Sequence, residues 1–157
     1  MCIRDSLETI RRLSDAGIPV CVLMAPIIPG LTDHEIPALL RAAREAGATS
    51  AGYVLLRLPY QIKALFLEWL ERHFPDRAAH VESLIRQTRG GDLYRSQFFE
   101  RQRGTGAHAH SIGQSFRLFS KRLAFNQHRP AMFQSSPPQP HTAARPTQQP
   151  TQLGLFD

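Results

Sequence analysis

The stretch PIIPGLTD, from Pro26 to Asp33, carries residue types that are suited to holding a ligand. Pro26 and Pro29 stiffen the backbone, and Gly30 has no side chain to keep a ligand away from the main chain. A helix that begins after this stretch would add unpaired N–H groups that favour an anion. The same residue types also suit a rigid turn with a capped helix, so the pattern alone leaves both interpretations open.

Arg57 follows a second apolar run, GYVLLRL, at the expected end of a buried strand. A guanidinium group is costly to bury unless it meets a carboxylate, a phosphate or a ligand. A salt bridge to a neighbouring loop and a contact with a ligand carboxylate both remain open for Arg57. For Tyr53, inside the same run, we favour core packing.

Positive charge is concentrated between residues 86 and 129, where the net charge is +7, against −1 for residues 1–85 and zero for the remainder. Arginines alternate there with aromatic residues, a combination that can neutralise phosphates and stack on bases. A solvated basic surface is the alternative. The predicted nucleic-acid-binding residues are Arg86, Arg89, Tyr94, Arg95, Arg101 and Arg103.

Metal-ligating residues are sparse. Cys2 and Cys21 are the only cysteines, which is too few for a disulfide framework and favours a reducing, cytoplasmic location. We expect Cys21 to serve as a small buried apolar residue of a strand. His108 and His110 have no further ligands nearby, so we place them in a polar loop and predict no metal site in this chain.

The elements that must position these residues alternate between helix and strand. A helix is expected up to Ala16 and another after a capping box at 32–35, where Pro37 favours a start at Asp33 or later. Continuous apolar runs at 20–25 and 52–58 indicate parallel strands buried on both faces. Amphipathic patterns predict further helices at 62–74, at 76–89 and around 112–123.

This order predicts an α/β fold with two parallel strands, followed by helices. We interpret residues 1–6, MCIRDS, as a non-native leader, 7–75 as the α/β unit and 76–126 as an arginine-rich helical extension. Residues 127–157, rich in Pro, Gln, Ser and Thr, are expected to be disordered. No run approaches the roughly 18 to 20 apolar residues of a membrane span.

PIIPGLTD resembles the fifth-strand G-x-I-x-G-x-x-E element of radical S-adenosylmethionine (SAM) enzymes. Ile28 and Gly30 match directly, whereas Pro26 stands in place of Gly and Asp33 in place of Glu. In that family the element lies against the adenine of SAM. The resemblance therefore implies that cofactor contacts come from Pro26, Ile28, Pro29 and Gly30, with Arg57 available to the SAM carboxylate.

A wider similarity covers roughly residues 7–126. GIPVCVLMAPIIPGLTDHEIPALLRAAREAGATSAGYVLLRLP, TRGGDLYRSQF and RGTG resemble the C-terminal half of bacterial radical SAM proteins related to spore photoproduct lyase. The resemblance implies the last two strands of a partial (βα) TIM-like barrel. It also implies a lyase-like parent enzyme that acts on DNA or another nucleic acid through a 5'-deoxyadenosyl radical.

The sequence departs from that family in one respect that decides activity. The family holds its 4Fe-4S cluster with a C-x-x-x-C-x-x-C motif, and such clusters require thiolates. The chain lacks this motif. We therefore expect the fragment alone to be inactive and to bind neither SAM nor the cluster fully, both belonging to the parent protein.

The terminal QLGLF resembles the Q-L-x-L-F peptide that bacterial replication and repair proteins insert into the sliding clamp. Its anchors would be Gln152, Leu153, Leu155 and Phe156, on a flexible tether. The alternative function is thus a non-catalytic nucleic-acid-binding or clamp-binding module. A phosphate-binding barrel of another chemistry is less favoured, because the first loop lacks a Gly-rich phosphate cradle.

Overall fold

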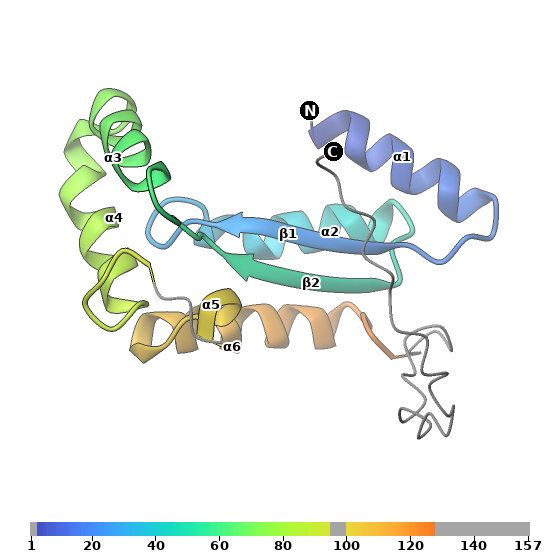
Figure 1. The fold of residues 1–157 in the computed structure, drawn as a ribbon. Helices are drawn as coiled ribbons and strands as arrows, with labels where there is room; N and C mark the ends of the chain where they lie inside the picture. The colour runs from blue at the N-terminus through green and yellow to red at the C-terminus, as the bar shows by residue number, and fades with distance from the viewer. Residues whose placement is uncertain (1–2, 95–99, 128–157) are drawn as a thin grey trace, which may run out of the picture.

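The computed structural model describes residues 3–94 and 100–127. At its centre lies a parallel two-stranded sheet of β1 (Cys21–Ile27) and β2 (Ser50–Leu55), connected by α2 (Ile36–Glu45) (Figure 1). The α/β class and the parallel pairing are confirmed. β1 continues through Pro26, after a cis Ala25–Pro26 peptide bond, and β2 ends three residues earlier than predicted.

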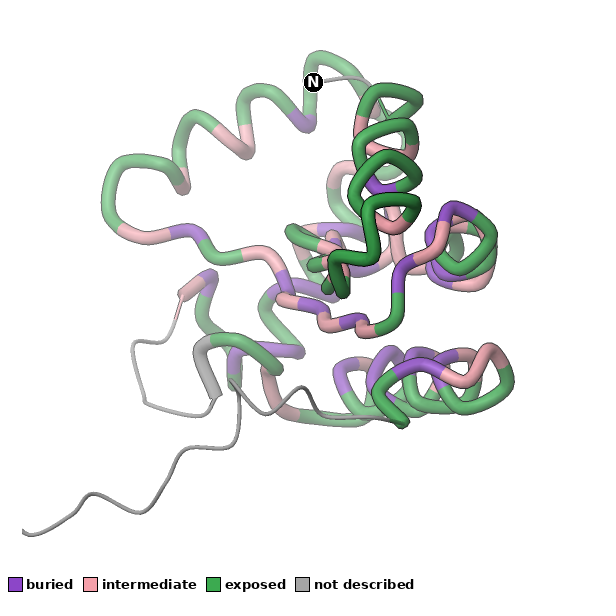
Figure 2. Tube along the Cα trace, turned by 90° about the vertical axis from the view of Figure 1, so that its right-hand side faces the viewer, coloured by how far each residue is buried: buried purple, intermediate pink, exposed green. Residues whose placement is uncertain are grey.

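The remaining predicted helices appear in the predicted order, together with one short helix at 100–103 that was not predicted. A short 3-10 turn, η1 (Asp33–Glu35), precedes α2. The others are α1 (Ile3–Asp15), α3 (Ile62–His73), α4 (Pro75–Gln87), α5 (Glu100–Arg103) and α6 (Gly106–Arg122). α1 begins inside the segment interpreted as a leader, and it exposes most of its length (Figure 2).

One face of the sheet is covered by helices. Register places Met24 beside Tyr53, so these two side chains share a face. The ring centroid of Tyr53 lies 4.7 Å from that of Phe116, and Tyr53 is 5% exposed, which confirms core packing for this residue. The helical part of this core comes mainly from α2 and α6, with one buried residue of α1; its members are Ile10, Ile36, Leu40, Ala43, Ala109, Ile112 and Phe116.

The opposite face of the sheet is open. Cys21 and Ala25 are exposed, and Leu23 between them is 61% exposed. The prediction of a strand buried on both faces is therefore wrong for β1, and Cys21 is not a buried apolar residue. The physical reason is that the described helices supply apolar partners to one side of the sheet only.

α3 and α4 form a hairpin beyond the carboxyl ends of both strands (Figure 1). α4 begins at Pro75, whose ring suits the first turn of a helix, and Asp76 lies inside that turn rather than capping it. The hairpin has its own apolar cluster, which reaches the loops after β1 and β2; its buried members are Leu31, Leu58, Leu70, Val81, Ile85 and Leu93.

The outer edge of β2 is closed by Asn126. Its side-chain amide donates to the Ala51 carbonyl and accepts from the Ala51 N–H, both at 3.0 Å. Its own backbone N–H donates to the Thr49 carbonyl at 3.1 Å. Because these groups occupy the ladder positions of a neighbouring strand, no further strand can pair with β2 at Ala51.

Candidate functional site

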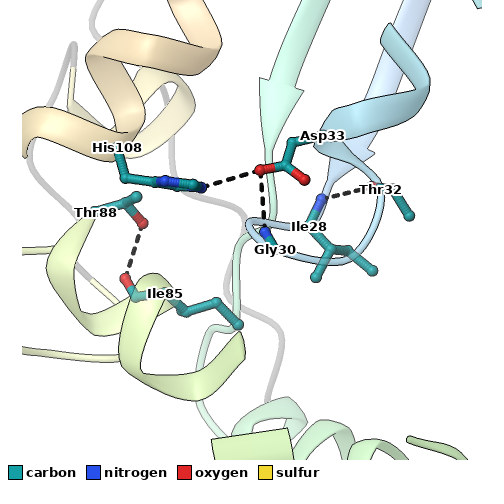
Figure 3. A network of polar contacts seen from close by, with 7 residues as sticks. All are labelled: Ile28, Gly30, Thr32, Asp33, Ile85, Thr88 and His108. Atoms are coloured by element: carbon teal, nitrogen blue, oxygen red, sulfur yellow. Dashed lines mark hydrogen bonds and ion pairs between the residues drawn. The ribbon is translucent and has the colours of Figure 1, made fainter. Parts of the chain in front are cut away.

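The loop after β1 is tied together by its own side chains (Figure 3). The Thr32 hydroxyl accepts a hydrogen bond from the Ile28 N–H at 2.9 Å, and Asp33 Oδ2 accepts one from the Gly30 N–H at 3.1 Å. The predicted capping box is absent, since Thr32 bonds backward into the loop and makes no side-chain cap. These bonds fix the loop conformation before α2 begins.

His108 ties this loop to α6. Its Nε2 lies 3.0 Å from Asp33 Oδ2, between partly buried side chains (Figure 3). His110, on the same helix, contacts Gln114. The placement of both histidines in a polar loop is thus wrong, because the helix begins at Gly106. Within residues 3–94 and 100–127, no cluster of His, Cys, Asp and Glu could hold a metal ion.

The residues predicted to contact SAM divide into two groups. Pro26 is exposed and Ile28 is half-buried against the hairpin cluster. Pro29 is fully buried, and a Cβ on Gly30 would lie 2.7 Å from Leu84 Cδ1. The absence of a side chain at Gly30 therefore serves packing against α4, not the approach of a ligand, and this corrects its expected role.

Arg57 and Arg89 both lie in surroundings that differ from those predicted for them: Arg57 was expected near a buried position and Arg89 at the surface. Arg57 is exposed, two residues beyond the end of β2. Arg89 is 1% exposed and donates from a terminal nitrogen to the Leu56 carbonyl at 2.8 Å. Burial, and then the positive charge of Arg57, lower the pKa of Arg89. Arg89 is thus not available at the surface to a phosphate, because the end of α4 folds over the chain leaving β2.

The other predicted nucleic-acid-binding residues that the structure describes differ in exposure and in the groups that they contact. Arg86 is exposed on α4 and pairs with Glu82 at 2.7 Å. Tyr94 is half-buried, near enough to Arg89 to act on its pKa. Arg103 is exposed and lies over the Tyr53 ring, 4.4 Å from its centroid. Arg95 and the side chain of Arg101 lie outside the described residues, as do Gln152, Leu153, Leu155 and Phe156.

Two cavities lie beside α6 that the sequence interpretation did not include. One, of about 310 Å³, is bordered by the loop that leads into α6, and the other is about 430 Å³. Both are lined by Arg103 and Arg117, and Lys121 lines the second. Lys121 follows Arg117 by four residues, which places both on one helix face. That spacing in the +7 segment was the signal available from sequence.

No helix in the described part of the chain combines the length and the apolar character needed to cross a bilayer. Comparison of the chain with family models, with curated proteins and with solved structures finds no match.

Proposed function

We propose that the chain is the C-terminal part of a radical SAM enzyme that acts on DNA or another nucleic acid by hydrogen abstraction. One observation carries the proposal: the loop PIIPGLTD stands at the carboxyl end of the first strand of a parallel β-α-β unit. Parallel α/β folds bind their ligands at that end of the strands. The resemblance to the radical SAM element concerns this same loop.

The open sheet face supports a barrel origin. Barrel strands turn one face outward to a ring of helices and the other inward to a packed interior. Here α2 and α6 cover one face, and the other presents Cys21, Leu23 and Ala25 without a cover from the described residues. An apolar face of this kind requires further apolar partners, which the remaining strands of a barrel would supply.

The fit to the cofactors is partial. Pro26 and Ile28 leave apolar surface that an adenosyl group could contact, and Arg57 is exposed and close to the end of β2. Pro29 is buried and Gly30 packs against α4, so this apolar surface comes from Pro26 and Ile28. A 4Fe-4S cluster would need thiolates from outside these residues, and with SAM it would supply the radical that abstracts hydrogen.

The decisive experiment uses the parent protein. We expect the reading frame upstream of the chain to encode a three-cysteine motif, and the anaerobically reconstituted full-length protein, with its cluster reduced by dithionite, to release 5'-deoxyadenosine from SAM. Absence of the motif from the upstream sequence would reject the enzyme class.

Ile28→Ala in this parent should raise the KM for SAM about tenfold, because it removes apolar contact with the adenosyl group. Ile18→Ala is the matched control, since Ile18 is 49% exposed at the opposite end of β1. An unchanged KM for SAM in Ile28→Ala would show that Ile28 does not contact the adenosyl group. An equal rise in both variants would indicate a general loss of structure.

A non-catalytic nucleic-acid-binding module is the second candidate. It is favoured by the exposed cations that line the cavities beside α6. This candidate predicts salt-sensitive DNA binding by the isolated chain with no SAM cleavage by the parent. Its clamp-binding form predicts that Phe156→Ala abolishes capture of the chain by a bacterial sliding clamp.

A further inference from the structure

The two cavities beside α6 share part of their lining, and together we call them the α6 groove. Its functional lining consists of Tyr53, Arg103, the loop 104–106, Arg117, Ser120 and Lys121. Arg103 and Arg117 border both cavities, so the cavities are adjacent. α5 and α6 lie together beside β2, which places the groove at the outer edge of the sheet (Figure 1).

The lining of the groove is cationic. Arg103, Arg117 and Lys121 border it, and among the residues that the structure describes no carboxylate does. Within the described residues none of these three cations forms an ion pair. The Tyr53 ring holds the Arg103 guanidinium at 4.4 Å, a distance at which a cation–π interaction orients the group. The groove therefore holds positive charge that the described part of the chain does not neutralise.

Ser120 borders the second cavity, and the residue is 7% exposed. Its hydroxyl oxygen is buried from solvent and has no hydrogen-bond partner in the described structure. Because a ligand in the cavity does not reach a buried oxygen, Ser120 contributes to the wall of the groove and not to the contacts that hold a ligand.

The loop at the start of α6 adds a backbone donor to the same place. Gly104 and Gly106 have φ of 68° and 85°, conformations that side chains disfavour. Thr105 makes no side-chain cap, and Gly106, the first residue of α6, borders the first cavity, where its N–H lies outside the hydrogen-bond ladder of the helix. This donor lies in the same place as the cations.

At Ala51 the groove has no free backbone groups of β2 with which an added strand could pair. The ladder groups of Ala51 are bonded to Asn126, which itself borders the second cavity. Base stacking is also disfavoured, because Tyr53, Phe116 and Phe125 are each 5% exposed. Cations and backbone N–H groups are the partners that phosphate oxygens use in nucleic-acid complexes.

We propose that the α6 groove binds successive phosphates of a nucleic-acid backbone, one in each cavity, without reading the base sequence. Arg117 and Lys121 are separated by about 6 Å along the helix axis, which allows each to contact a different phosphate. This inference deepens the nucleic-acid part of the proposed function and rests on it.

The test measures binding of a fluorescently labelled, mixed-sequence single-stranded DNA to the 157-residue chain by anisotropy over a salt series. Arg117→Gln with Lys121→Gln should weaken binding at least tenfold at low salt. It should also reduce the slope of log K against log salt by about 1.4, because two phosphate contacts are lost. Ser120→Ala, which keeps the charge and removes a hydroxyl that is buried from the cavity, should change binding less than twofold.

The matched control is Arg11→Gln with Arg72→Gln, which removes the same charge from α1 and α3. It should change affinity less than twofold. Equal losses in the two double variants, or unchanged binding in the groove variants, overturn the proposal. Circular dichroism confirms that each variant is folded.

A competition arm distinguishes a nucleic-acid backbone from a free phosphate ligand. Inorganic phosphate at millimolar concentration and constant ionic strength should leave the DNA bound, because one phosphate cannot replace contacts to several. Displacement under these conditions would assign the groove to a small phosphate compound and overturn the backbone proposal.

Failure here is separable from failure of the enzyme proposal. Release of 5'-deoxyadenosine by the parent, measured without nucleic acid, should be unaffected by the groove variants. An active parent whose groove variants bind DNA normally would reject the groove alone. An inactive parent whose groove variants lose DNA binding would reject the enzyme class alone.

Discussion

The two faces of the central sheet have similar apolar side chains but different surroundings. On the covered face, Met24 and Tyr53 pack under α2 and α6. On the open face, Leu23 is 61% exposed beside Cys21 and Ala25. The difference shows that the side chains of β1 do not by themselves decide which face is buried. Burial depends on which helices return to the sheet.

The largest test of this comparison contrasts Leu40 with Leu23. Leu40→Ala empties space under the covered face, where Leu40 is fully buried, and should lower the free energy of unfolding by about 2–5 kcal/mol. Leu23→Ala should lower it by less than about 1 kcal/mol, because the side chain is already mostly in water. Urea denaturation followed by circular dichroism measures both. Similar losses would show that the open face is covered in solution.

A second test extends the comparison to the loop after β1. Gly30→Ala should cost about 2–4 kcal/mol of unfolding free energy, because it combines a left-handed backbone with a contact of 2.7 Å to Leu84. Gly17→Ala has a similar φ of 74° but no atom within 4 Å of its Cβ, so it should cost only about 1–2 kcal/mol. If both variants lost the same free energy of unfolding in thermal and urea experiments, the packing of Gly30 against α4 would not contribute to stability.

The test with the smallest expected change in unfolding free energy compares the buried Arg89 with the exposed Arg86. Arg89→Met keeps an unbranched apolar stem but removes the guanidinium donor to the Leu56 carbonyl, and should cost about 1.5–3 kcal/mol. Arg86→Met breaks only an exposed pair with Glu82 and should cost less than about 0.5 kcal/mol. If the order were reversed in the same urea assay, the buried position assigned to Arg89 would be wrong.

The sequence predicts the order and type of most elements because long apolar runs and 3.6-residue periods are strong local signals. Val20–Ala25 and the pattern at Ile62 therefore placed β1 and α3 close to their observed ranges. Their surroundings are not local. Arg89 is buried because α4 folds back over Leu56, more than thirty residues earlier in the chain, and no pattern near Arg89 encodes that contact.

The candidate site shows the same division between local and distant information. The stiff loop at Pro26–Gly30 was predictable from residue types, whereas the pairing of Asp33 with His108 joins residues 75 positions apart. Arg117 and Lys121 belong to the basic segment, but the apolar period of α6 predicts only its buried face and not what its cationic face lies against. Only the fold of α6 along β2 brings these cations to the same groove as Arg103.

The side-chain amide of Asn126 influences which edge of the sheet can accept a further strand. One side chain supplies both an acceptor and a donor to Ala51, and so imitates the backbone of a missing neighbour. A strand that paired with β2 along its whole length would therefore have to displace the Asn126 amide from Ala51. A larger sheet built on this unit would extend more readily from β1.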